Sequence, residues 1–97
     1  MEKATFARNQ ICPLLDQLIL ELDAEGSSTQ KAYFCRVRGH LDHAADDFEL
    51  ATPILELSSS LAIGFQFSNT ANVLVARIQE KAEELVRALE GVTPNIH

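Results

Sequence analysis

The sequence has few of the residues that identify several common classes of small protein. Two cysteines are fewer than a disulfide-stapled secreted scaffold uses, and no Cys-x-x-Cys pair occurs. Four glycines form no Gly-rich phosphate loop and no Gly-x-Ser-x-Gly elbow. We expect Cys12 and Cys35 to be reduced thiols in the core. We also expect a protein that is not an enzyme and that binds no cofactor.

Basic residues are scarce as well. The chain has 8 Lys and Arg against 14 Asp and Glu, which gives a net charge of −6. A field of this sign repels a phosphate backbone and an anionic membrane surface. The charge balance therefore argues against nucleic acid and membranes as partners and leaves another protein as the expected partner.

The sequence contains no segment typical of a leader or of a membrane span. Residues 1–10 lack the apolar core of a signal peptide. The most apolar stretch, 54–67, is interrupted by Glu56, by three serines and by Gln66, so it is too short and too polar to cross a bilayer. These features lead us to expect a cytoplasmic protein.

What is present is typical of one small helical domain. The chain has 97 residues, 46% of them apolar, which predicts a single domain over 1–97. A helix is predicted over 13–25 with a stop at Gly26. For residues 3–11 we favour a helix kinked at Pro13 over a separate turn, because one apolar stripe runs through both parts. That stripe comprises Ala7, Ile11, Leu14, Leu15, Leu18, Ile19 and Leu22.

The next segment departs from helical periodicity. Residues 26–30 are predicted to form a loop. Over 33–37 the period shifts towards two, with Tyr33, Cys35 and Val37 on one side, so a short strand is compatible with this stretch. A lone strand needs a partner, which the same segment of a second copy would supply. An extended connector is an equally good interpretation.

Two further helices are predicted. One begins near Leu41 and is interrupted at Thr52-Pro53, where we expect a kink or a fresh start. The other covers 70–90, is closed by Gly91, and leaves 91–97 as a frayed tail. Its apolar residues follow a heptad seam. The seam comprises Ala71, Val75, Ile78, Ala82, Leu85 and Leu89.

The sequence thus predicts a mainly α fold of three to four helices in a small bundle. The segment 54–67 is apolar on most sides, and an all-round apolar helix must be buried from several directions. Together with the other two apolar stripes it exceeds what a short monomer is expected to hide. We therefore expect a homodimer, which buries such faces isologously.

One polar cluster could carry chemistry. On a helix, His43 and Asp47 would share a face, with His40 one turn earlier, and imidazole and carboxylate groups are ligands for divalent metals. Aspartates at this position also complement a helix dipole, and we expect no metal. A phosphoacceptor role for His43 lacks a nearby lysine to steady a phosphoryl group.

The predicted function is that of a small non-enzymatic regulatory module, of the anti-activator or adaptor kind, that binds protein through an apolar helical groove. Arg36 and Arg38 are either solvated or an electrostatic contact for an acidic partner. The alternatives are a metal- or phosphate-handling protein that uses His40 and His43, and a structural subunit of a larger assembly. The residues predicted to bind a partner or form the dimer are Ile54, Leu57, Leu61, Phe65, Phe67, Leu74, Ile78 and Leu85.

Overall fold

A computed structural model describes residues 3–58 and 65–92 of the chain. Within these ranges every regular element is helical, in the order α1, η1, α2, α3, α4 and α5. The predicted mainly α bundle is confirmed. No helix in the described part of the chain is long and apolar enough to cross a membrane.

The first helical run consists of α1 (Lys3–Phe6), the π-helical turn η1 (Ala7–Ile11) and α2 (Cys12–Glu25). The Cys12 N–H donates to the Ala7 carbonyl, five residues earlier, directly before Pro13. Proline has no N–H to donate, so a widened turn beside it keeps the run helical. The prediction of one helical run through Pro13, favoured over a separate turn, is confirmed, and a π-helical turn lies just ahead of Pro13. Gly26, at φ 75°, ends α2 as predicted.

Helix α3 (Ser28–His43) occupies the region predicted as a loop and a short strand, so that prediction is wrong. The buried residues Phe34, Val37 and Leu41 are spaced by three and four, which is the helical period, whereas Cys35 is exposed. A helix satisfies its own backbone hydrogen bonds, while a lone strand would have needed a partner. The apparent alternation over 33–37 was coincidental.

Helix α4 (Asp47–Ser58) begins after a short connection and not at Leu41, which belongs to α3. Asp46 caps it: Asp46 Oδ1 accepts a hydrogen bond from the Glu49 N–H at 2.8 Å, and Glu49 Oε1 accepts one from the Ala45 N–H at 3.2 Å. The helix then continues through Pro53, so of the kink or fresh start predicted at 52–53 the fresh start is wrong. The cap at Asp46 sets the start of the helix instead.

Helix α5 (Asn69–Val92) confirms the predicted last helix and ends one residue beyond Gly91. Ser68 caps it by accepting a hydrogen bond from the Ala71 N–H at 3.1 Å. The heptad seam is buried from Ala71 to Leu85. The Leu89 side chain and residues 93–97 of the predicted tail lie outside the description.

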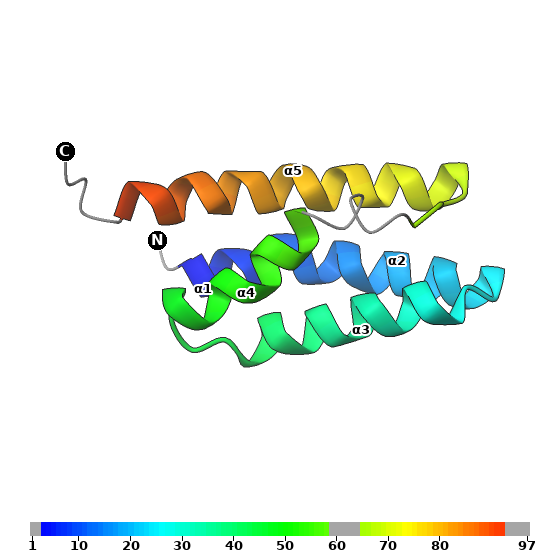
Figure 1. Cartoon of the computed structure of the whole chain (residues 1–97), viewed down its shortest axis with the longest axis horizontal. Coiled ribbons are helices and arrows are strands. Elements are labelled where there is room, and N and C mark those ends of the chain that lie inside the picture. Colours follow the sequence, from blue (N-terminus) through cyan, green and yellow to red (C-terminus); the bar gives the residue numbers. More distant parts are fainter. Residues whose placement is uncertain (1–2, 59–64, 93–97) are drawn as a thin grey trace.

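The helices form an elongated bundle with extents of 46 × 24 × 18 Å. Helices α2 and α3 make an antiparallel pair, α5 runs antiparallel to α2, and the short α4 crosses obliquely between α3 and α5 (Figure 1). Their inward faces share one apolar core. The single chain thus buries the inward apolar residues of α4 and α5. A short monomer was not expected to hide all of these residues, and a homodimer was predicted for that reason. Homodimer formation therefore stays a prediction.

Candidate interaction surface

The structure encloses half of the predicted partner-binding residues in the chain's own core. Ile54, Leu57, Ile78 and Leu85 are each at most 2% exposed, so in this conformation they offer no groove to a partner. Leu74 is half-buried against the same core. Leu61 lies outside the described residues.

Phe65 and Phe67 are half-buried in an aromatic cluster with α3. The Phe65 ring lies 5.4 Å from Tyr33, and the Phe67 ring lies 6.0 Å from Phe34, between ring centroids. The Tyr33 hydroxyl donates to the Glu56 carbonyl of α4 at 2.8 Å, and burial raises the pKa of Tyr33. The cluster therefore holds the segment before α5, and α4, against α3.

The basic residues Lys31, Arg36 and Arg38 divide between two sides of α3. Arg38 pairs with Asp16 and Lys31 pairs with Asp23, both on α2, at 2.5 and 2.7 Å. Arg36 faces α4 instead, where its guanidinium lies 3.1 Å from a Glu56 carboxylate oxygen. The hydrogen bond to Asp16 raises the pKa of Arg38 and the bond to Asp23 raises that of Lys31. Each of these cations thus has a carboxylate partner on a neighbouring helix, and an electrostatic contact of Arg36 and Arg38 with another protein stays a prediction.

The structure does not show the arrangement of His40, His43 and Asp47 on which the metal alternative depends. Helix α3 ends at His43 and α4 begins at Asp47. The prediction that His43 and Asp47 share one face of a helix is therefore wrong. A ring nitrogen of His43 lies 2.8 Å from the Gly39 carbonyl, while His40 lies 3.6 Å from Glu56. Among the residues that the structure describes, no group of three or more His, Cys, Asp or Glu side chains is arranged to hold a metal.

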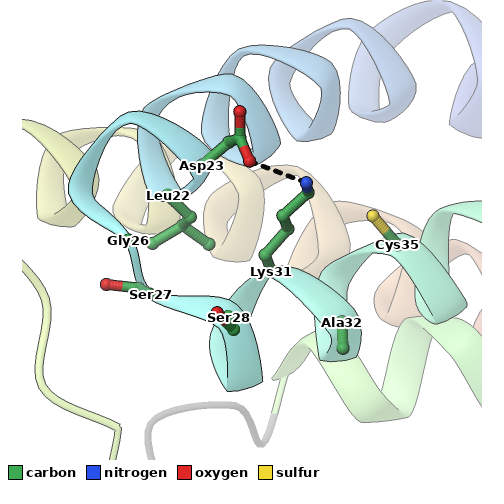
Figure 2. Close-up of a pocket in the computed structure, with 8 residues that line it drawn as sticks. All are labelled: Leu22, Asp23, Gly26, Ser27, Ser28, Lys31, Ala32 and Cys35. Carbon is green, nitrogen blue, oxygen red and sulfur yellow. Dashed lines mark hydrogen bonds and ion pairs between the residues drawn. The ribbon is translucent and has the colours of Figure 1, made fainter.

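A hollow beside the α2–α3 turn combines a thiol with a cation (Figure 2). It has a volume of about 280 Å³ and is spanned by the Lys31–Asp23 ion pair, with Cys35 at its edge. Cys35 is exposed, so the prediction of a core thiol is wrong for this residue and holds for Cys12. Burial raises the pKa of the Cys12 thiol, which keeps that thiol protonated and unreactive at neutral pH.

Within residues 3–58 and 65–92, two of the exposed large apolar side chains lie on the outward side of α4. Phe48 is 87% exposed and Leu55 is 59% exposed, with the exposed Thr52 between them. These three residues, spaced by four and three, form one line on the helix, which we call the α4 ridge. The buried side of α4 lies opposite and comprises Leu50, Pro53, Ile54 and Leu57. The sequence does not predict this ridge, because Leu41, Ala44 and Phe48 are spaced by three and four, which places Phe48 on the same side of one helix as Leu41. When the helical period is counted from the buried residue Leu50 instead, Phe48 falls on the outward side of α4.

A hollow lies next to the ridge, between the end of α3 and α4. This α3–α4 hollow has a volume of about 300 Å³ and is lined by His40, His43, Ala44, Glu49, Thr52 and Pro53. Ala44 and Pro53 are buried, so they provide an apolar floor. Arg8 of η1 donates a hydrogen bond to the Ala44 carbonyl at 3.2 Å, which ties the floor to the first helical run. The ridge and the hollow share Thr52, so they form one continuous surface.

Comparisons with protein-family models, with curated proteins and with solved structures give no match. Function is therefore inferred from the chain's own surface. In the part of the chain that the structure describes, two other large apolar side chains are exposed, Leu20 on α2 at 71% and Val73 on α5 at 56%. Neither borders the α3–α4 hollow, so both serve as controls for the α4 ridge.

Proposed function

We propose that this protein is a small non-enzymatic regulatory module, of the adaptor or anti-activator kind, that binds another protein through the α4 ridge. The carrying observation is an apolar ridge on a helix whose opposite side is anchored in the core. The inner residues of α4 already account for its packing. Phe48 and more than half of the Leu55 side chain are exposed to solvent, which favours contact with a partner as their use.

The energetics of binding favour this assignment. An aromatic side chain buries about 150–250 Å² at an interface, and a few such anchors supply most of the binding free energy. The ridge is presented by a helix capped at Asp46 and packed on both α3 and α5. Such preorganisation lowers the entropy lost on binding.

We also propose that the protein acts in the cytoplasm. Cys12 and Cys35 are both free, and the exposed Cys35 thiol suits a reducing compartment, where disulfides are rare. The test is the redox state of this thiol in cells, where rapid labelling of a reduced Cys35 by a membrane-permeant thiol reagent is expected. A Cys35 found fully oxidised in its native setting contradicts this location.

Affinity purification from the source cells tests the binding function, with wild-type protein compared with Phe48→Asp and with the matched control Leu20→Asp. Position 48 lies in the first turn of α4, where an aspartate is compatible with the helix dipole. We expect at least one protein to be enriched by wild type and by Leu20→Asp and to be lost with Phe48→Asp. A set of captured proteins that is identical for all three variants contradicts the proposal.

A further inference from the structure

We infer that the α4 ridge and the α3–α4 hollow together bind a basic amphipathic helix of another protein. This inference rests on the proposed function and specifies the chemistry of the partner. It depends on the shape of the surface, on the carboxylates that border it, and on the poor fit of a second copy to the same surface.

The shape suits a helix. Phe48 and Leu55 are seven residues apart, about 10.5 Å along the helix axis. A partner helix lying along the ridge has the same seven-residue repeat, so successive apolar side chains meet both ends of it. The α3–α4 hollow, with Ala44 and Pro53 as its floor, accepts an apolar side chain of that helix.

The charges around the surface select a basic partner. Asp46 and Glu49 are exposed at the N-terminal end of the ridge, and neither has a cationic partner among the described residues. Their capping hydrogen bonds use Asp46 Oδ1 and Glu49 Oε1, which leaves the second oxygen of each carboxylate for an incoming lysine or arginine. Glu56 differs, because Arg36 already pairs with it. The net charge of −6 also steers cations towards the chain.

A second copy fits the same surface poorly. If two α4 helices paired in parallel about a two-fold axis, Asp46 and Glu49 of one copy would meet their own counterparts, which sets carboxylate against carboxylate. If they paired antiparallel, Asp46 and Glu49 would approach Glu56 and an Arg36 that Glu56 already pairs with. Neither arrangement supplies a cation that lacks a carboxylate partner, and each chain carries −6. Two apolar side chains also fall short of the roughly 800 Å² per partner that a stable dimer buries.

Fluorescence anisotropy with two labelled synthetic helices tests the inference on the full chain. Both probes carry leucines at the same heptad positions, and one has lysines on its polar face where the other has glutamates. We expect the lysine probe to bind at least about tenfold more tightly than the glutamate probe, with the difference shrinking at high salt. Equal binding of the two probes overturns the inference.

Matched double variants separate a site from the general field of an acidic protein. Asp46→Asn with Glu49→Gln removes two charges at the ridge and retains capping groups, because asparagine is a good N-cap. Glu80→Gln with Glu84→Gln removes the same charge from the exposed side of α5. We expect the first pair to weaken the lysine probe by about tenfold and the second pair by less than about twofold. Equal losses contradict a site at α4.

The outcomes distinguish this inference from the proposed function. If Phe48→Asp removes a cellular partner but the two probes bind alike, the function stands and the basic partner is contradicted. If sedimentation velocity shows a wild-type dimer that Phe48→Asp abolishes, the occupant is a second copy and the inference is overturned. Binding of the lysine probe that Phe48→Asp removes and Leu20→Asp retains supports it.

Discussion

Helices α4 and α5 pack against each other and share the core, yet their outer sides differ. The outer side of α5 is largely polar, with Glu83 and Arg87 forming an i,i+4 pair at 3.7 Å and Val73 as an exposed apolar residue. The outer side of α4 carries Phe48 and Leu55. A polar outer side is satisfied by water, whereas an apolar one gains free energy from a partner. The difference shows that the apolar residues of a helix indicate a candidate binding surface only when they lie outside the core.

The largest expected effect separates inner from outer positions on both helices. Leu57→Ala and Ile78→Ala should each lower the free energy of unfolding by about 3 kcal/mol, because each leaves a cavity in the core. Leu55→Ala and Val73→Ala should each change it by less than about 0.5 kcal/mol. Urea unfolding followed by circular dichroism measures all four. A loss at Leu55 as large as that at Leu57 would erase the distinction between the two sides of α4.

A smaller effect tests where α4 begins. Asp46→Ala should cost about 1 kcal/mol of stability, because it removes the cap that accepts the Glu49 N–H. Asp46→Asn should retain most of the stability, and Thr52→Ala should have little effect. Thermal unfolding of the three variants decides the matter. If Thr52→Ala were the costly change, the helix would start at 52–53, and Phe48 would no longer lie on a helical ridge.

The smallest effect concerns pH and extends the inner–outer contrast to the two thiols. Burial raises the pKa of Cys12 above its ordinary value of 9.0. The folded state therefore holds this proton more tightly than the unfolded state. The corresponding stability is fully present below about pH 9 and is lost as the pH rises through the raised pKa. Unfolding followed from pH 7 to 10.5 should show this loss in wild type and in Cys35→Ala, and a smaller loss in Cys12→Ala. Identical profiles in all three would contradict the burial of Cys12.

Much of the fold could be predicted because local signals agreed with packing. The α2 stripe ends at Gly26, and the α5 heptad seam follows a serine cap, so periodicity and terminators indicated the same elements. Helix α3 was missed because aromatic and β-branched residues over 33–37 mimic a strand. Only the spacing of Phe34, Val37 and Leu41 shows the helix.

The candidate surface could not be predicted from the sequence because hydrophobicity does not tell which side of a helix is inside. Ile54 and Leu57 were expected to bind a partner and instead form the core. Phe48 continues the helical spacing of Leu41 and Ala44, which are buried, and nevertheless faces outward. The orientation of α4 is set by the break at 44–46 and by contacts with α3 and α5, which are tertiary information.

The central claim is that Phe48 serves binding and not folding, and one variant tests both parts. Phe48→Ala should leave the free energy of unfolding within about 0.5 kcal/mol of wild type. In the same preparation it should weaken the lysine-bearing helical probe by at least about tenfold, or about 1.4 kcal/mol, while Leu20→Ala changes neither quantity. Unchanged probe binding, or a stability loss of about 2 kcal/mol or more, the size of a core truncation, would contradict the account.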